Sequence, residues 1–415
     1  MNKTTASISE QIDFDKIRDD FPVLHQQVNG HPLAYLDNGA SSQMPVQVAD
    51  RIDHYHRYEH SNVHRGIHTL SQRATDAYEE TRGKIQTFLN ARLKDEIIFT
   101  TGTTDSINLV ANSYGGSRLS EGDEIILTEM EHHANIVPWQ MIAQQTGAVI
   151  KVVPVDDSGD LDMEAYKSML SRKTKIVSVI HISNALGTIN PVNEITDLAH
   201  EAGAAVLIDG AQSAPHEVID VQEMDCDFYV FSAHKMCGPT GFGILYGKKE
   251  YLDDMPPYRG GGDMIDKVSF EETTYNVAPF KFEAGTPPIA AGIGLGAAVD
   301  YLNSIGMEAI AEREHALVEY LVERLKTVTG LRLIGESEHR ASVASFVFDH
   351  IHASDMGTLL DKRGIAVRTG HHCAQPIMRR FNVPATTRAS LSFYNSREDI
   401  DQLVDGIEYV KTFFE

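Results

Sequence analysis

Cysteine is scarce in this sequence. The 415 residues contain three, Cys226, Cys237 and Cys373, an odd number at wide spacing. Such a set argues against a disulfide framework, which is typical of small secreted domains. Each thiol therefore has to be interpreted from its own neighbours in the chain.

Long hydrophobic runs and a targeting signal are also lacking. No apolar stretch approaches the roughly 20 residues that a membrane-spanning helix needs. The start, MNKTTAS, has neither the basic cluster nor the apolar segment of a secretory signal. We therefore expect a cytoplasmic protein that does not associate with membranes.

Positive charge is the third deficit, with 36 Lys and Arg against 59 Asp and Glu and a net charge of −23. Nucleic-acid binding depends on Lys and Arg, so this balance argues against a nucleic-acid partner.

The apolar fraction of 42% and the charged fraction of 23% are those of an ordinary globular protein. A chain of this length exceeds one compact core, which favours two domains.

Strand-like and helix-like segments alternate from about residue 95. Helical patterns at 104–114 and 191–203 lie among them, the second with Pro at its start and Gly at its end. This alternation predicts an α/β protein whose mostly parallel sheet has helices on both faces. The segments that suit buried strands are 96–100, 124–127, 149–154, 176–181, 204–208 and 227–231.

The alternation of short strands and helices ends at about residue 296. A long helical pattern at 308–328 and a strand-like run at 343–348 follow. We place a second, smaller domain there. The expected organisation is an N-terminal segment at 1–25 that packs near the small domain and has mobile opening residues, a large domain at 26–296 and a small domain at 297–415.

Two side chains of complementary chemistry follow neighbouring predicted strands. Asp209 comes directly after the strand at 204–208, with Gln212 three residues later, and Lys235 closes the run SAHK after the next strand. Ligands of such sheets bind beyond the carboxyl ends of the strands. Pyridoxal phosphate needs a lysine for its Schiff base and a carboxylate for its pyridine nitrogen. Either residue alone has an ordinary explanation, but the pair predicts a pyridoxal-phosphate site.

Two glycine-containing segments resemble phosphate sites. The run TGTT at 101–104 lies between a strand and a helix, where backbone N–H groups and the helix dipole attract an anion, although it is also an ordinary helix cap. The glycines at 292, 294 and 296 do not follow a clear strand, and we expect them to serve helix packing. There is no Walker-type loop, so a nucleotide is not implied.

The three thiols have different surroundings. Cys226 and Cys237 lie in apolar or strand-edge settings typical of buried cysteines. Cys373 lies in the polar run RTGHHCAQP at 368–376, which predicts an exposed loop. Its two histidines and one arginine would stabilise a thiolate and so a nucleophile. The alternative is an exposed cysteine without a role.

A row of histidines offers a different class of function, a metal-binding scaffold. His56, His60, His64 and His68 recur every fourth residue, a spacing at which helical histidines can bind zinc. However, Gly66 and polar neighbours interrupt the helical pattern, and no cysteine pair or acidic cluster accompanies the row. We expect no metal site.

Three segments together resemble the cysteine desulfurases of the second group, the SufS and CsdA type: SAHK at 232–235, RTGHHCA at 368–374 and RASL at 388–391. The lysine motif alone indicates the aminotransferase class V superfamily, and the cysteine loop narrows the resemblance. The resemblance covers the chain from about residue 35 to the end. It implies the pyridoxal-phosphate-dependent transferase fold of type I, similar to aspartate aminotransferase, with a smaller α+β C-terminal domain that carries the cysteine loop.

The resemblance also implies roles for single residues. Lys235 would carry the cofactor, Cys373 would receive sulfur, and Thr286 would reach the cofactor phosphate of the other subunit in a homodimer. Arg388, with Arg368, would bind the substrate carboxylate. The other implied cofactor contacts are Asp209 at the pyridine nitrogen, Gln212 at the phenolic oxygen, His132 stacked on the ring with a catalytic role, Asn184 near cofactor and substrate, and Thr103, Thr104, Ser232 and His234 at the phosphate.

The chain departs from the pattern of these enzymes at two positions. Cys237 stands where tyrosine is usual, and Thr101 stands where arginine is common. Neither change removes an essential group. We expect Cys237 to fill space without a chemical role.

The implied reaction removes sulfur from L-cysteine and gives L-alanine and a persulfide on Cys373. Selenocysteine lyase, kynureninase and aminotransferase are the alternatives; the cysteine loop disfavours an aminotransferase but leaves L-selenocysteine open as a substrate. The loop lacks the longer extension of IscS-type enzymes. A small acceptor protein of the SufE or SufU type is therefore expected, with iron–sulfur clusters or another thio-cofactor as the destination.

Overall fold

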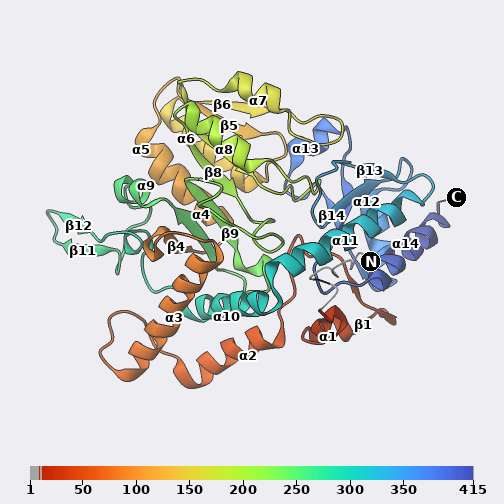
Figure 1. The fold of residues 1–415 in the computed structure, drawn as a ribbon, viewed down its shortest axis with the longest axis horizontal. Coiled ribbons are helices and arrows are strands. Elements are labelled where there is room, and N and C mark those ends of the chain that lie inside the picture. Colours follow the sequence, from red (N-terminus) through yellow and green to blue (C-terminus); the bar gives the residue numbers. More distant parts are fainter. Residues whose placement is uncertain (1–8, 10–11, 415) are drawn as a thin grey trace, which may run out of the picture.

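The computed structural model describes residue 9 and residues 12–414, so most of the predicted mobile start lies outside the described residues. A seven-stranded sheet forms the centre of the larger part of the molecule (Figure 1). Strand β10 runs antiparallel to both of its neighbours, and the other pairs are parallel. In spatial order the strands are β4 (Ile97–Thr100), β10 (Gly243–Gly247), β9 (Phe228–Ser232), β8 (Ala205–Asp209), β7 (Thr174–Ile180), β5 (Glu124–Thr128) and β6 (Val149–Val153).

The central strands are apolar throughout because both faces of the sheet are buried. In β8, Val206 and Ile208 join one hydrophobic cluster while Leu207 joins another on the opposite face. The first cluster includes residues of α3 (Thr69–Phe88), α8 (Val192–Glu201) and α10 (Ile289–Ile305), and the second includes residues of α4 (Thr103–Val110) and α6 (Val137–Thr146). The predicted α/β sheet covered on both faces is confirmed.

The glycine pattern at 292–296 lies within α10, as expected for helix packing. A Cβ atom on Gly292 would come within 2.4 Å of the Tyr78 ring, and one on Gly296 within 2.5 Å of the Thr81 hydroxyl, both on α3. Glycine therefore lets α10 and α3 approach closely.

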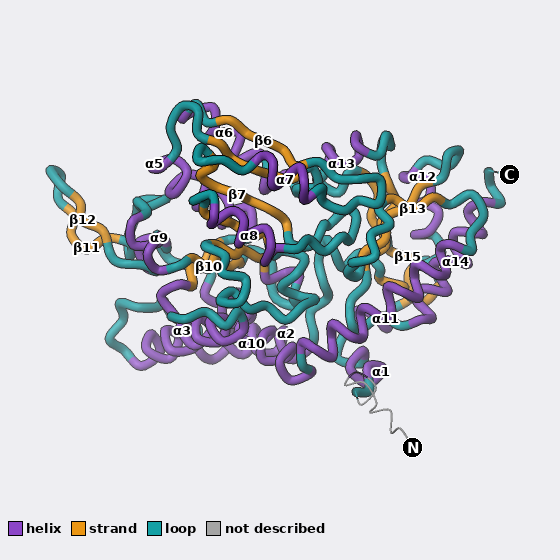
Figure 2. The backbone as a smooth tube through the Cα atoms, turned by 45° about the horizontal axis from the view of Figure 1, so that its top comes forward, coloured by secondary structure: helices purple, strands orange, loops and turns teal. Residues whose placement is uncertain are grey.

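A second sheet of four antiparallel strands forms the core of the smaller part of the molecule. Helices α11 (Met307–Lys326), α12 (Ala353–Asp361) and α14 (Arg397–Lys411) accompany it (Figure 2). Its strands, in spatial order, are β13 (Arg332–Ile334), β14 (Val343–Val347), β17 (Thr386–Ser390) and β16 (Arg368–Gly370). The remaining elements are α1 (Phe14–Arg18), β1 (Gln27–Val28), β2 (His31–Pro32), β3 (Ala34–Tyr35), α2 (Val46–His54), α5 (Gly116–Arg118), α7 (Met163–Met169), α9 (Lys249–Asp254), β11 (Ile265–Val268), β12 (Thr273–Tyr275), β15 (Ile365–Ala366) and α13 (Gln375–Arg380).

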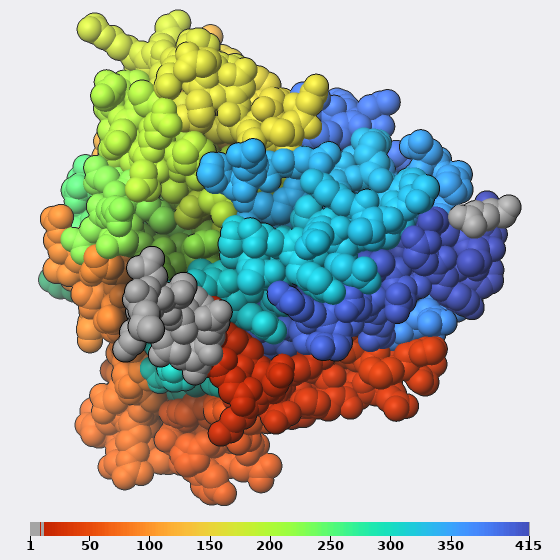
Figure 3. All heavy atoms as spheres, turned by 45° about the vertical axis from the view of Figure 1, so that its right-hand side comes forward, coloured from red at the N-terminus to blue at the C-terminus, as the bar shows by residue number. Residues whose placement is uncertain are grey.

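The early part of the chain lies against this smaller sheet and its helices (Figure 3). Strand β3 pairs in parallel with β15, and Arg18 forms an ion pair with Asp399 at 2.9 Å. Helix α10 runs without interruption through residue 297. The domain boundaries at 25/26 and 296/297 stay predictions.

Most differences from the predicted elements are small. The helix predicted at 104–114 begins at Thr103 and changes at Ala111 into a wider turn that ends at Gly115.

Within the described part of the chain, no single helix has the length and composition of a membrane span; α10 and α11 meet that test only as a pair bent by 75°.

Candidate active site

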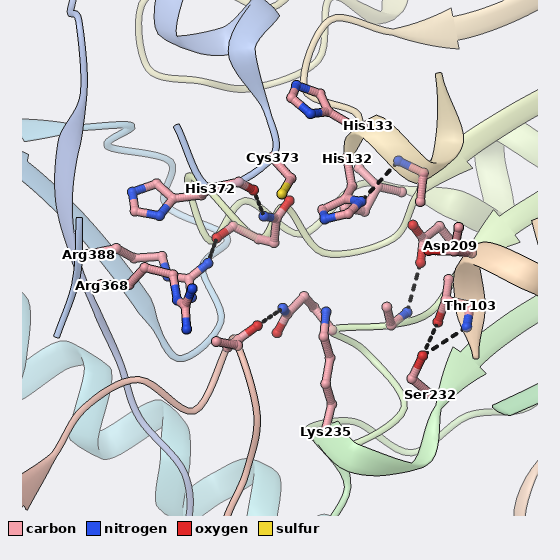
Figure 4. Close-up of a pocket in the computed structure, with 18 of the residues that line it drawn as sticks. Thr103, His132, His133, Asp209, Ser232, Lys235, Arg368, His372, Cys373 and Arg388 are labelled. Carbon is pink, nitrogen blue, oxygen red and sulfur yellow. Dashed lines mark hydrogen bonds between the residues drawn. The ribbon is translucent and has the colours of Figure 1, made fainter. Parts of the chain in front are cut away.

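A cavity of about 550 Å³ lies beyond the carboxyl ends of the parallel strands and is bordered by the loops of the smaller sheet (Figure 4). Thr286 does not line it but lines a separate cavity of about 140 Å³. The structure thus brings together all the other predicted site residues, which are Thr103, Thr104, His132, Asn184, Asp209, Gln212, Ser232, His234, Lys235, Arg368, Cys373 and Arg388.

Lys235 and Asp209 come from neighbouring strands. Asp209 was expected just after the strand but is the last residue of β8. It is 2% exposed. Lys235 ends a short 3-10 turn that follows β9. Burial lowers the pKa of Lys235 to about 8, with the positive charge of Arg388 acting in the same direction, while Asp209 opposes the shift. A lysine with this pKa has a substantial neutral amine fraction near neutral pH, as a group that forms a Schiff base needs.

The turn between β4 and α4 provides an anion site. Gly102 is the N-cap of α4 with φ of 144°, a conformation that glycine adopts readily. The Ser232 hydroxyl accepts the Thr103 N–H at 2.8 Å and also bonds the Thr103 hydroxyl at 2.8 Å. Backbone N–H groups at a helix start, together with these hydroxyls, suit a phosphate.

His132 presents an uncharged ring to the cavity. Its Nδ1 accepts the Ala134 N–H at 3.0 Å, so the neutral ring carries its proton on Nε2. Burial lowers the pKa of His132 to about 4, with Lys235 and other cations adding to the shift.

The preceding Glu131 is fully buried and accepts hydrogen bonds from Thr128, Asn135 and the backbone of Ile180. This anchor was not predicted; its signal in the sequence is an acidic residue three positions after the end of the apolar strand β5.

Two arginines from adjacent strands share one carboxylate. Arg368 on β16 and Arg388 on β17 are paired in the register, and Asp37 binds the first at 2.8 Å and the second at 3.3 Å. Arg388 is 2% exposed, and its Nη1 donates to the Asn184 carbonyl at 2.8 Å. Burial lowers the pKa of Arg388 to about 10, so it stays charged at neutral pH. Asp37 was also missed, because nothing local in the sequence marks it as a partner of two distant arginines.

The Cys373 thiol is exposed, as predicted, on a loop with specific anchors. The Asn184 amide donates to the His372 carbonyl at 2.6 Å, and the His133 N–H donates to the Cys373 carbonyl at 2.7 Å. The His372 ring bonds the Thr386 hydroxyl at 2.7 Å instead of the thiol. Burial, together with the nearby arginines, lowers the pKa of His372 to about 3. The prediction that both loop histidines stabilise a thiolate is therefore wrong for His372, which is neutral.

The other two thiols are buried, which confirms the prediction of their surroundings. Burial raises the pKa of both Cys226 and Cys237. The Cys237 N–H donates to the Ser42 hydroxyl at 2.7 Å.

The histidine row does not form a cluster. Among residues 9 and 12–414, no group of three or more His, Cys, Asp or Glu side chains has the arrangement of a metal site. His64 instead bonds Glu79 at 2.9 Å, and the rings of His56 and His60 stack.

The cavity holds the lysine and the carboxylate that pyridoxal phosphate requires, together with polar groups that lack a partner. Within the described residues, Asn184 Oδ1, Gln212 Oε1 and Arg388 Nε are buried and have no hydrogen-bond partner. Buried polar atoms are seldom left unpaired, so these groups fit a bound polar molecule. Together with Lys235, Asp209 and the anion site, they fit this cofactor.

Comparison with known proteins agrees with the geometry. The model of the aminotransferase class-V family matches residues 34–403. A probable cysteine desulfurase of Halalkalibacterium halodurans is 53% identical over 394 residues, which are 95% of this chain and 97% of the relative. A cysteine desulfurase of Escherichia coli is 51% identical over 95% of this chain and 98% of its own length.

Solved structures give the same result for the fold. The cysteine desulfurase CsdA (S-sulfonic acid) from Escherichia coli superposes with a TM-score of 0.91 and 38% identity over 97% of this chain and all of that chain. The predicted type I fold is confirmed. Because the family match spans every residue that lines the cavity, the chain belongs to the aminotransferase class-V family.

Proposed function

We propose that this chain is a cysteine desulfurase, which uses pyridoxal phosphate to remove sulfur from L-cysteine and leaves L-alanine and a persulfide on Cys373. One observation carries the proposal: a single cavity holds the Lys235 and Asp209 pair, two arginines and an exposed cysteine. The names and identities of the full-length relatives support the same activity.

The cofactor, when bound, supplies a ring that stabilises negative charge at the substrate α-carbon. Lys235 would hold it covalently, and Asp209 would bind its pyridine nitrogen. Once released from the cofactor, the Lys235 amine is suited to take the α-proton, since its pKa of about 8 lies near neutral pH. The contacts of the cofactor phosphate would come from Thr103, Thr104, Ser232 and His234, while Gln212, His132 and Asn184 would contact the ring.

The substrate carboxylate would bind to Arg388 with help from Arg368. A guanidinium binds a carboxylate through two parallel hydrogen bonds, and Arg388 Nε is a buried donor without a partner in the described structure. Asp37 holds both guanidinium groups at the cavity wall. These residues would therefore select an amino acid and orient its side chain.

Sulfur transfer requires a nucleophile that matches a sulfur centre. The Cys373 thiolate attacks the substrate sulfur, and an S–S bond forms as the carbon–sulfur bond breaks. The electron pair of the broken bond stays on the three-carbon product, which takes up protons and becomes alanine. The exposure of Cys373 lets the resulting persulfide be passed on.

The wider context is proposed on the same basis. A small acceptor protein of the SufE or SufU type would take sulfur from the exposed Cys373 and supply iron–sulfur clusters or another thio-cofactor in the cytoplasm. Thr286 does not line the cofactor cavity of its own protomer. In a homodimer it would contact the cofactor phosphate of the other protomer.

Alanine formation tests the activity. Wild-type protein loaded with cofactor and given L-cysteine with a thiol reductant should release alanine and sulfide in equal amounts. Cys373→Ala should bind the cofactor and release no alanine, whereas Cys226→Ala, a buried thiol outside the cavity, should behave as wild type. Release of alanine from L-selenocysteine alone would replace the proposal with selenocysteine lyase.

A further inference from the structure

The Cys373 loop has a backbone conformation that it would not adopt readily alone. Gly370, His372 and Cys373 have φ values of 125°, 52° and 55°. For a residue with a side chain this left-handed region is unfavourable, and it persists where neighbouring structure holds it. The contacts that hold the loop therefore determine how the thiol is presented.

Helix α13 starts two residues after Cys373 and lacks a cap of its own. The first N–H groups of a helix have no partner within it, and a side-chain acceptor at the N-cap commonly satisfies one of them. The N-cap here is Ala374, which has no such acceptor. Instead, the Gln375 N–H donates to Nε2 of His133 at 3.1 Å. A distant imidazole thus caps the helix that follows the nucleophile.

The same histidine holds the other side of the thiol residue. The His133 N–H donates to the Cys373 carbonyl at 2.7 Å, so two hydrogen bonds of His133 lie on either side of the Cys373 residue. His133 directly follows His132, which lines the cofactor cavity. The buried Glu131, one residue earlier, anchors this turn through three hydrogen bonds.

We propose that His133 is a positioning residue for sulfur transfer, whose neutral imidazole caps α13 and fixes the Cys373 loop against the turn that carries His132. This inference rests on the proposed role of Cys373 as the sulfur acceptor. The ring accepts at Nε2, so its proton lies on Nδ1. Burial and the nearby His371 lower the pKa of His133, which favours this neutral form.

Two substitutions separate the acceptor from the bulk of the side chain. His133→Leu removes the acceptor, while His133→Gln keeps an oxygen near the position of Nε2; the main-chain bond to Cys373 remains in both. For the leucine variant we expect kcat for alanine release to fall about tenfold with KM within about twofold, because a small displacement of a reacting group is costly. The glutamine variant should recover most of the loss, and the cofactor absorbance should match wild type in both.

Hydrogen exchange provides a readout without substrate. The Gln375 amide should exchange about fivefold to tenfold faster in His133→Leu than in wild type, and His133→Gln should restore its protection. Wild-type exchange and kcat in the leucine variant would overturn the inference, as would equal losses in both variants or a change confined to KM. If wild-type protein made no alanine from cysteine, the proposed function would fail, while the exchange rates would still decide whether His133 holds the loop.

Discussion

Replacement of Gly243 by alanine should displace the Gly102 turn of the phosphate site and weaken cofactor binding. Gly243 opens β10, and an added Cβ would lie 2.4 Å from Cα, 2.7 Å from N and 2.8 Å from C of Gly102. Ordinary contact begins near 3.4 Å, so the turn must move by roughly 1 Å. Both partners are backbone, and no side chain can rotate away to relieve the contact.

The displaced turn carries the start of α4. A shift there moves the N–H groups meant for phosphate and disturbs the 2.8 Å bond between Thr103 and Ser232. A hydrogen bond to a charged group contributes about 1.5–3 kcal/mol, so the loss of one or two costs about 1.5–6 kcal/mol. The expected rise in the cofactor Kd is about 10-fold to 20,000-fold.

Titration of the apoenzyme with pyridoxal phosphate, followed by absorbance, measures this change. Gly116→Ala is the matched control, because Gly116 has φ of −63° and no atom within 4 Å of the added Cβ. A thermal melt of each apoenzyme shows that the fold is retained. A Gly243→Ala protein that binds cofactor as tightly as wild type would refute the argument.

Three other substitutions have defined outcomes. Lys235→Ala should release no measurable alanine from L-cysteine, since no other lysine is among the described residues that line the cavity; turnover at the wild-type rate would exclude its assignment. Asp37→Asn weakens the hydrogen bonds that hold Arg368 and Arg388 in place and should raise KM about tenfold with a smaller effect on kcat, and an unchanged KM in steady-state assays would argue against this positioning role. Arg82→Met leaves the carboxylate of Glu283 without its 2.7 Å partner and should lower the free energy of unfolding by about 3–5 kcal/mol in urea titrations, whereas a loss under about 1 kcal/mol would contradict the buried pair.

The sequence predicted the parallel strands well because their signal is local. Strands β5, β7, β8 and β9 all begin and end within two residues of the predicted runs, which are continuous and apolar. Strand β10 (Gly243–Gly247) was not predicted, since glycines at both ends weaken the strand pattern and its antiparallel pairing depends on distant partners.

In the candidate site too, the residues marked by a local signal were predicted, and those that depend on partners distant in the sequence were not. Asp209 and Lys235 could be placed together because parallel strands end at one edge of a sheet. The pairing of Asp37 with two arginines, and the bonds from His133 to the Cys373 loop, join elements far apart in sequence. The charge of His372 depends on its burial, which removes the positive charge that the composition of the loop suggested.

Mass spectrometry of the protein after brief incubation with L-cysteine tests the central claim most directly. The account predicts the added mass of one sulfur atom on the peptide that contains Cys373, with no such addition in Cys373→Ala. A persulfide found on Cys226 or Cys237 instead, or wild-type alanine release by Cys373→Ala, would contradict it.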